Sequence, residues 1–465
     1  MTAPLPQTTH TQLGPAFYDS VRPAVFPRHI LRYRNQSAAA SIGLDGLSDK
    51  AFIDHFAGFT PLPGSLTEPL ALRYHGHQFG TYNPELGDGR GFLFAQFTEA
   101  GTGRLLDLGT KGSGRTPYAR TADGRLTLKG GVREVLATEL LTALDVPTSQ
   151  TFSLIETGEA LERHDEPSPA RSSVLVRLLH SHIRIGSFQR LAYLGQADNL
   201  QTLLRYTVRH YYPAIDPDQG YKPLILAFLP AFAARVAEMV AGWMAAGFVH
   251  GVLNTDNFNI TGESFDYGPW RFLPYLDPGF TAAYFDQTGR YAYGRQPAAA
   301  MWALCRLADC FVNEHDPDVL AETLSGFYPA LERHLARRLC WRLGVDSPDD
   351  DTALTVSGLV FAAAKASRIG WDTLFHDLYG GHLPAEGADP LWQSAPELRR
   401  LADTLAGWAP RQSEQAVAAQ KAAPLVCLEL SVVEGVWAAI AEHDDWTAFD
   451  QIIADIRAYA ARLRA

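Results

Sequence analysis

The stretch HGVLNTDNFNITGESFDYG, residues 250–268, decides how the rest of the chain is interpreted. Asp256 and Asn257 stand side by side in a polar loop, and Asp266 follows nine residues after Asn257. Two oxygen ligands on either side of a short hairpin are a common way to hold a nucleotide-bound Mg²⁺. The sequence therefore predicts a metal site with Asn257 and Asp266 as ligands, and it leaves Asp256 as an unexplained neighbour.

The composition is that of an ordinary globular protein. The chain has 465 residues, 46% of them hydrophobic, and its net charge of −11 argues against a nucleic-acid partner, because such proteins usually carry a basic face. A small anionic ligand held by a few arginines and lysines remains compatible with this charge. The four cysteines show no CxxC spacing, which fits a reducing compartment, and we expect a cytoplasmic protein.

We expect neither a signal peptide nor a membrane partner. The first fifteen residues, MTAPLPQTTHTQLGP, lack a basic region followed by an apolar one. No uninterrupted apolar run reaches the roughly 20 residues that a membrane-spanning helix needs. Residues 1–70 are Pro-rich and predict an N-terminal extension with short helices at 38–44 and 49–57.

A glycine-rich hairpin is predicted after this extension. Its strands are expected at 91–98 and 104–111, across a Gly-Thr-Gly turn. Gly87, Gly89 and Gly91 lead into the first strand and would let the backbone come close to a ligand. The hairpin is therefore a candidate lid over phosphates, although a plain hairpin with a flexible entry explains the glycines as well.

A lysine on a strand and a glutamate on the next helix form a second candidate group. Lys111 ends the second strand, and the spacing of leucines and valines predicts a helix over 130–144, with Glu134 in its first turn. Protein-kinase-like enzymes use such a pair to orient a phosphate-binding lysine. Two alternatives stay open: Glu134 is only a charge favoured by the helix dipole, or Glu139 takes the role instead.

Two arginines lie in and after the last strand of this region. Strands are expected at 151–156 and 173–179, and Arg177 lies inside the apolar run VLVRLL of the second one. A buried guanidinium is costly unless it is paired or bound to a ligand. A triphosphate would serve as the partner of Arg177 and of Arg184, and a structural salt bridge explains Arg177 equally well.

The second half of the chain is predicted to be mostly helical. Residues 191–247 have a helical pattern, and Pro297 begins a helix that reaches about residue 311. Further helices are expected at 320–343, 352–364, 367–379, 396–405 and 430–464.

The order of these features is the ground plan of the protein-kinase fold. Asn257 stands seven residues after His250, as in the kinase pattern H-R-D-x-x-x-x-N, and Asp266 begins a DYG triplet where D-F-G would stand. We predict an α+β, protein-kinase-like bilobal fold with a small β-rich N-lobe and a larger helical C-lobe, plus N-terminal and C-terminal helical extensions. The expected divisions are 1–70 (extension), 71–190 (N-lobe), 191–330 (C-lobe with catalytic and metal loops) and 331–465 (helical C-terminal region).

One departure from the kinase pattern matters. The usual kinase base stands two residues after the histidine, and here that position is Val252, which cannot accept a proton. The chain is therefore either a nucleotide-binding pseudoenzyme, or it uses another base. Asp256 is the nearest candidate.

Five blocks of the sequence resemble the selenoprotein O (SelO, YdiU-like) family. They are YHGHQFGTYNPELGDGR (74–90), KGSGRTPYARTADGR (111–125), HSHIRIGSF (180–188), HGVLNTDNFNI (250–260) and FDYGPWRFLPYLDPGF (265–280). The resemblance spans about residues 15–315, and Phe265 replaces the leucine expected before DYG. Members resemble pseudokinases that bind the nucleotide in an inverted orientation relative to kinases. The resemblance implies a protein adenylyltransferase that moves AMP from ATP onto protein Ser, Thr or Tyr hydroxyls.

The resemblance also implies roles for individual residues. The nucleotide would be contacted by Gly87, Gly89, Arg90, Lys111, Asp123 and Gly124. Lys111 would pair with Glu134, the phosphates would be bound by Arg177 and Arg184, and Asp256 would accept the proton. Asn257 and Asp266 would hold Mg²⁺, with Mn²⁺ as the alternative.

The C-terminal region departs from the family. Residues 380–465 match weakly, and the last cysteine is Cys427, whereas the family often has a cysteine or selenocysteine close to its end. We therefore do not expect a redox switch built on such a residue.

The function predicted from the sequence is Mg²⁺-dependent transfer of AMP from ATP, bound in inverted orientation, to protein hydroxyls. The alternatives are a kinase-type phosphotransferase and a catalytically inactive nucleotide-binding scaffold. The expected partners are ATP and protein substrates, and we expect a monomer.

Overall fold

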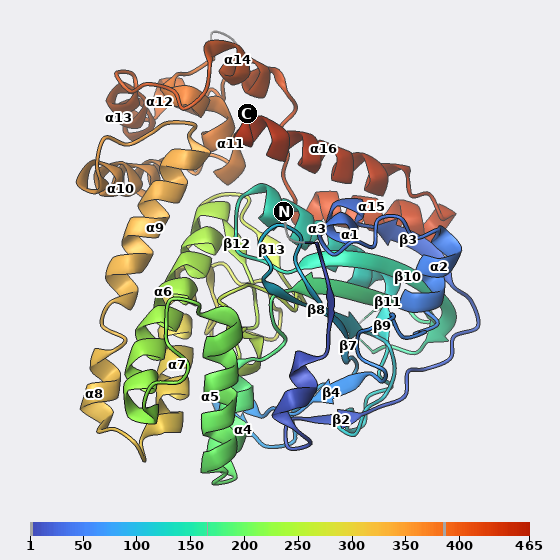
Figure 1. Ribbon diagram of the computed structural model, residues 1–465. Coiled ribbons are helices and arrows are strands. Elements are labelled where there is room, and N and C mark those ends of the chain that lie inside the picture. The colour runs from blue at the N-terminus through green and yellow to red at the C-terminus, as the bar shows by residue number, and fades with distance from the viewer. Residues whose placement is uncertain (1–2, 165, 385–386) are drawn as a thin grey trace.

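A nine-stranded antiparallel sheet forms one lobe of the computed structural model, which describes residues 3–164, 166–384 and 387–465 (Figure 1). Its main path runs β2, β4, β7, β8, β11, β10 and β3, with β1 added to β7 and β9 to β11. Two small hairpins, β5–β6 and β12–β13, lie outside this sheet. The strands are β1 (Pro6–Gln7), β2 (Tyr18–Ser20), β3 (Ile30–Arg34), β4 (Leu70–Leu72), β5 (Gly76–Gln78), β6 (Thr81–Asn83), β7 (Leu93–Thr98), β8 (Leu105–Lys111), β9 (Leu126–Thr127), β10 (Gln150–Leu161), β11 (Ala170–Leu179), β12 (Phe248–Val249) and β13 (Arg271–Phe272).

Helices cover the sheet and build the other lobe. They are α1 (Gln36–Ser41), α2 (Asp49–Phe56), α3 (Leu128–Ala143), α4 (Ile185–Tyr193), α5 (Ala197–Tyr211), α6 (Tyr221–Ala246), α7 (Gln296–Ala308), α8 (Pro317–Glu322), α9 (Phe327–Arg342), α10 (Asp350–Ser367), α11 (Trp371–Asp377), α12 (Leu391–Ser394), α13 (Pro396–Leu405), α14 (Glu414–Ala422), α15 (Leu430–His443) and α16 (Thr447–Arg464). The predicted hairpin corresponds to β7 and β8, the predicted helix to α3, and the following strand pair to β10 and β11, which extends further than expected.

The sheet is buried on both faces. Side chains alternate along a strand, so neighbours on β11 point to opposite sides. Leu175 packs in the hydrophobic cluster of α3, whereas Val174 and Val176 pack with Phe52 and Phe56 of α2. The first 70 residues therefore supply the two predicted helices, and they also supply three strands, β1 to β3, that the sequence did not predict.

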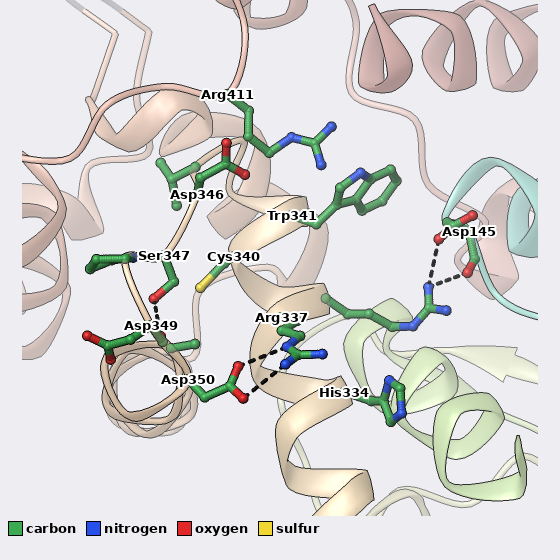
Figure 2. A pocket seen from close by; sticks show the side chains of 14 residues that line it. Asp145, His334, Arg337, Cys340, Trp341, Asp346, Ser347, Asp349, Asp350 and Arg411 are labelled. Carbon is green, nitrogen blue, oxygen red and sulfur yellow. Dashed lines mark hydrogen bonds and ion pairs between the residues drawn. The ribbon is translucent and has the colours of Figure 1, made fainter. Parts of the chain in front are cut away.

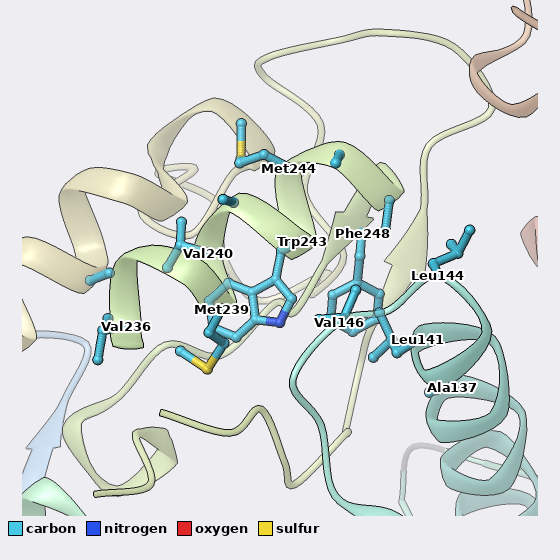
Figure 3. Packing of buried hydrophobic residues seen from close by; sticks show 14 of the residues in the cluster. Ala137, Leu141, Leu144, Val146, Val236, Met239, Val240, Trp243, Met244 and Phe248 are labelled. Atoms are coloured by element: carbon cyan, nitrogen blue, oxygen red, sulfur yellow. The ribbon is translucent and has the colours of Figure 1, made fainter. Parts of the chain in front are cut away.

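The helical lobe is built around α6. In Figure 3, Trp243 and Phe248 lie close to Leu141 and Val146. Leu141 lies near the C-terminal end of α3, and Val146 follows the helix. One hydrophobic cluster thus continues from α3 into α6 and joins the two lobes. By length and composition α6 is apolar enough to cross a membrane, but 61% of its most apolar window is buried inside the protein, as expected for a central core helix.

The C-terminal helices agree with the prediction in type but not in all bounds. The helix expected at 320–343 is split into α8 and α9, and the one expected at 430–464 is split into α15 and α16 at Asp444, which adopts a left-handed φ of 52°. The helix expected at 367–379 shortens to α11 because Arg368 also has a positive φ. Helices α12 and α14 were not predicted.

The arrangement is an α+β, protein-kinase-like bilobal fold, as predicted. The sheet lobe contains β8, which ends at Lys111, and α3, which carries Glu134. The loop 250–268 extends from the helical lobe toward these two residues. The C-terminal helices add to this core: α16 runs beside α3 on the outside of the sheet lobe (Figure 1).

Candidate active site

The loop 250–268 is fixed at both ends. The ring Nε2 of His250 lies 3.0 Å from the backbone oxygen of Phe265, which ties the start of the loop to its end. Asp256 sits in a short 3-10 turn, and Asp266 adopts a left-handed φ of 65°. As a result both carboxylates line one cavity of about 320 Å³ between the glycine-rich hairpin and this loop.

Most of the predicted site residues line this cavity. They are Gly87, Gly89, Arg90, Lys111, Arg177, Arg184, Asp256 and Asp266. Six other lining residues with polar side chains were missed: Tyr74, Gln78, Asp88, Thr110, Tyr118 and Arg120.

A buried ion cluster forms the floor of the cavity. Lys111 Nζ lies 2.6 Å from Glu134 Oε2 and 2.7 Å from Asp266 Oδ1. Arg177 Nη1 lies 3.4 Å from both of these carboxylates. Because the lysine and Glu134 are nearly inaccessible to solvent, the cluster positions Lys111 rigidly. Arg177 thus belongs to a salt-bridge network and also lines the cavity, and its role in phosphate binding stays a prediction.

The structure also decides between the two glutamates of α3. Glu139 points to the other side of the helix, where Arg457 of α16 binds it at 2.8 Å and Tyr33 donates a hydrogen bond to it. Glu134 is the partner of Lys111. The spacing of one helical turn plus one residue places the two carboxylates on different faces.

Arg184 connects the glycine-rich segment to the 3-10 turn Thr255–Asn257, hereafter the catalytic turn because it carries the predicted base. This residue is only 2% exposed; its Nη1 donates to the backbone oxygen of Asp256 at 3.1 Å, and its Nη2 lies 3.4 Å from Asp88 Oδ1. Burial raises the pKa of Asp88, and the carboxylate also accepts a hydrogen bond from the backbone N–H of Leu72. The signal for Asp88 was present in the sequence as the one acid of the GDGR segment.

The pKa values of the two aspartates of the loop are shifted in opposite directions. Burial raises the pKa of Asp256 to about 6, against the lowering effect of Arg184. Burial acts on Asp266 in the same sense, but Lys111, Arg177 and Arg184 outweigh it and hold the pKa of Asp266 well below its usual range. Oδ1 of Asp256 is buried and has no hydrogen-bond partner in the part of the chain that the structure describes. Asp256 is therefore equipped to take up a proton, and Asp266 to stay ionised.

The donor set of the loop fits Mg²⁺. Asp266 offers a carboxylate that is 25% exposed toward the cavity. Asn257 lies behind the lining, and its Nδ2 donates to the backbone oxygen of Val252 at 2.9 Å, which leaves the amide oxygen as its metal-binding atom. Among residues 3–164, 166–384 and 387–465, no group of three or more His, Cys, Asp or Glu side chains could hold a metal ion. A metal here would rely on few protein oxygens, which is usual for Mg²⁺ in nucleotide sites.

The glycines of the hairpin entry allow close contact within the protein. A side-chain carbon on Gly87 would lie 2.3 Å from the ring of Tyr118, and one on Gly91 would lie 2.0 Å from the backbone oxygen of Thr110. The absence of side chains thus lets the entry pack against the segment 111–125. The same glycines also line the cavity, and their contact with a ligand stays a prediction.

Two predicted nucleotide contacts lie outside the cavity lining. Asp123 is exposed, and its carboxylate pairs with Arg163 at 2.8 Å. Gly124 has a φ of 74°, and a side chain there would collide with Gly114, so this glycine closes the loop that carries Tyr118 and Arg120.

Other cavities lie away from this cluster. The pocket in Figure 2, of about 560 Å³, lies beside α9, and two of its arginines are already paired, Arg337 with Asp350 and Arg338 with Asp145. None of the predicted catalytic or metal-binding residues lines it. We therefore place the candidate active site in the cavity between the lobes.

Comparison with known proteins gives a family for the chain. Residues 5–457 match the model of the family described as protein adenylyltransferase SelO. The chain is 42% identical over 459 residues to a protein nucleotidyltransferase YdiU of Synechocystis sp., covering 95% of each protein. It is 34% identical over 469 residues to the protein of the same name from Rhizobium meliloti, covering 97% of this chain and 93% of that one.

Two solved structures show a distant similarity. One is the kinase domain of a Toxoplasma gondii rhoptry antigen, with 13% identity, a TM-score of 0.29, and coverage of 63% of this chain and 84% of that one. The other is ROP2 from Toxoplasma gondii, titled a virulence factor with a protein-kinase fold and no enzymatic activity, with 13% identity, a TM-score of 0.26, and coverage of 58% and 75%. Similarity at this level does not bear on the function of this chain.

Proposed function

This chain belongs to the protein adenylyltransferase SelO family and is a protein nucleotidyltransferase, and we propose that it moves AMP from ATP to Ser, Thr or Tyr hydroxyls of other proteins with the help of Mg²⁺. ATP lies reversed relative to protein kinases, so that the α-phosphate, rather than the γ-phosphate, faces the catalytic turn. The enzyme acts in the cytoplasm as a monomer, and its four free cysteines are compatible with a reducing compartment.

The observation that carries this proposal is the state of Asp256. The kinase base position holds Val252, whose side chain cannot accept a proton. Asp256 lies four residues further on and lines the cavity, with a pKa raised to about 6 and a buried, unpartnered Oδ1 among the described residues. A carboxylate with a pKa near the working pH is suited to accept a proton from a hydroxyl.

The proposed step is an in-line displacement. Asp256 takes the proton of the acceptor hydroxyl while the hydroxyl oxygen forms a bond to the α-phosphorus of ATP. The bond between the α-phosphorus and the bridging oxygen breaks, and pyrophosphate leaves with that electron pair. The products are an AMP ester on the acceptor, pyrophosphate, and a proton on Asp256 that is lost to solvent.

The cations of the cavity meet the main electrostatic demand of this step. Negative charge develops on the leaving pyrophosphate, and preorganised cations that face it lower the barrier. Lys111, Arg177 and Arg184 line the cavity, and each is buried, so their positions are fixed before the reaction. A metal ion held by Asp266 and Asn257 would supply further Lewis-acid stabilisation of phosphate charge.

The position of the label tests the proposal. The protein is incubated with Mg²⁺ and a mixture of acceptor proteins, in parallel with [α-³²P]ATP and [γ-³²P]ATP. Label from the α position on protein, and none from the γ position, is the expected result. Label from the γ position would instead identify a kinase-type phosphotransferase. Tight ATP binding without label from either position would identify a scaffold.

A further inference from the structure

An exposed group of aromatic side chains lies next to the catalytic turn. Phe79, Tyr284 and Phe285, hereafter the aromatic patch, are 39%, 83% and 46% exposed. The ring centroids of Phe79 and Phe285 are 5.8 Å apart, and those of Tyr284 and Phe285 are 5.2 Å apart, so the three rings form one surface from two distant segments. Contiguous exposed rings of this kind mark binding surfaces more often than single exposed side chains do.

The patch is tied to the backbone that carries Asp256. The N–H of Phe79 donates to Asn254 Oδ1 at 3.1 Å, and the hydroxyl of Tyr291 donates to the same oxygen at 2.9 Å. The Tyr291 ring in turn lies 5.0 Å from that of Phe79. Asn254 is two residues before Asp256, and the patch is therefore held at a fixed position relative to the proposed base.

The strand before Phe79 lies directly against the catalytic turn. His77 N–H donates to Thr255 Oγ1 at 2.7 Å. A side-chain carbon on Gly76 would lie 3.3 Å from Asp256 Oδ1, so the glycine allows β5 to approach the carboxylate. Phe79 itself has a φ of 49°, a left-handed conformation that a bulky residue seldom adopts and that clusters at functional sites.

A cation lies beside the patch without an acidic partner. The guanidinium of Arg290 stacks over Trp302 at 5.0 Å, and a side-chain carbon on Gly80 would lie 3.3 Å from its Nη2. In the part of the chain that the structure describes, no carboxylate lies within 4.0 Å of this guanidinium, and its Nε is buried without a hydrogen-bond partner. In a chain with a net charge of −11, such a cation offers charge complementarity to an acidic segment.

We propose that the aromatic patch and Arg290 bind the acceptor segment of the protein substrate. The segment places an aromatic or large apolar side chain on the patch and an acidic side chain on Arg290, and this presents its hydroxyl to Asp256. This inference rests on the proposed function, because it names the feature by which the acceptor of AMP is selected.

Positional scanning of peptides tests the inference. Peptides with a central Ser, Thr or Tyr carry Phe, Ala, Glu or Lys at each flanking position in turn, and AMP transfer from [α-³²P]ATP is measured with Mg²⁺. The protein is expected to prefer Phe at one flanking position and Glu at another. Tyr284→Ala combined with Phe285→Ala should raise KM for the best peptide about tenfold with little change in kcat, because truncation of exposed aromatic anchors removes binding energy.

Arg290→Glu provides the sharper arm of the experiment. Reversal of this charge should change the preferred acidic flanking residue to Lys, which a merely structural role of Arg290 would not do. Tyr328→Ala is the matched control. Tyr328 on α9 lies outside the patch, and its exposed fraction of 42% is similar to that of Phe285. All these variants should bind ATP as the parent does.

The outcomes separate failure of this inference from failure of the proposed function. If the parent transfers AMP and the patch variants keep its KM and its flanking preferences, the inference is wrong and the function stands. If the parent labels no peptide or protein from [α-³²P]ATP, both are wrong. If light scattering shows a dimer of the parent that Tyr284→Ala/Phe285→Ala abolishes, while KM is unchanged, the patch is a contact between copies of the chain, which also overturns the inference.

Discussion

The two ends of the loop 250–268 carry the same functional group in opposite surroundings. Asp256 lies in a turn where burial raises its pKa to about 6, and its Oδ1 has no hydrogen-bond partner among the described residues. Asp266 lies 2.7 Å from Lys111 Nζ and 3.4 Å from Arg177 Nη1, and these cations overcome the effect of burial and hold its pKa well below the usual range. Identical side chains ten residues apart are thus prepared for different chemistry, and their surroundings rather than their position in a motif assign the roles.

The largest expected effect comes from the ionised end of the loop. Asp266→Asn removes the charge that would hold the metal and leaves Lys111 with one carboxylate instead of two. We expect AMP transfer, measured with [α-³²P]ATP under saturating Mg²⁺, to fall roughly 10³–10⁵-fold, the range seen when a principal electrostatic element of phosphoryl transfer is lost. Undiminished, metal-dependent labelling in this variant would remove Asp266 from the metal site.

The other end should show a different kinetic signature. Asp256→Asn keeps the shape of the side chain and removes the proton acceptor, so transfer should fall about 10²–10⁴-fold while the affinity for ATP stays close to that of the parent. The measurement pairs labelling with an equilibrium ATP-binding titration. Full transfer activity would exclude Asp256 as the base, and equal loss of ATP affinity would assign it to binding instead.

The pH dependence of transfer sharpens the contrast further. Because the pKa of Asp256 is raised to about 6, its carboxylate is ionised above that pH and protonated below it. The rate of AMP transfer at subsaturating acceptor should therefore be flat above about pH 7 and fall about tenfold per pH unit below pH 6. Asp266 should contribute no limb in this range. A profile of Asp256→Asn that keeps the acidic limb would show that another group titrates.

The smallest expected effect is on stability, and it should have opposite signs at the two ends. At pH 7.5 ionised Asp256 lowers the free energy of unfolding, because its folded pKa lies above the unfolded value of about 3.9. Ionised Asp266 raises it, because its folded pKa lies below that value, and this contribution is lost as the pH falls through the folded pKa.

Thermal unfolding at pH 7.5 is the measurement. Asp256→Asn should raise Tm by about 1–2 °C, and Asp266→Asn should lower it by a similar or larger amount. A shift of the same sign in both variants would contradict the assigned surroundings.

Local spacing was enough to suggest a pair between Lys111 and a glutamate of the next helix. Lys111 ends β8 and Glu134 lies in the second turn of α3, one turn later than expected because the helix begins at Leu128, and the structure places their side chains 2.6 Å apart. Local spacing left the choice between Glu134 and Glu139 open, and the resemblance to the family favoured Glu134. In the structure the choice depends on α16, which reaches Glu139 from more than 300 residues further along the chain.

Residues that meet only through long-range folding were missed, or they lie outside the cavity lining. Tyr118 and Arg120 reach the cavity because the loop 111–125 folds back over the hairpin entry, and no periodic pattern marks that path. Asp123 comes from the same loop, but its carboxylate points to Arg163 on the protein surface. Strand β3 was missed for a similar reason, because its partner β10 lies more than 100 residues away.

The most direct test of the account is a crystal structure with a non-hydrolysable ATP analogue and Mg²⁺. The account predicts that the α-phosphate lies beside Asp256, that the metal ion contacts Asp266 and Asn257, and that the β- and γ-phosphates lie among Lys111, Arg177 and Arg184. An analogue whose γ-phosphate lies beside Asp256, with the α-phosphate remote from it, would contradict the inverted orientation and with it the assignment of AMP transfer to this site.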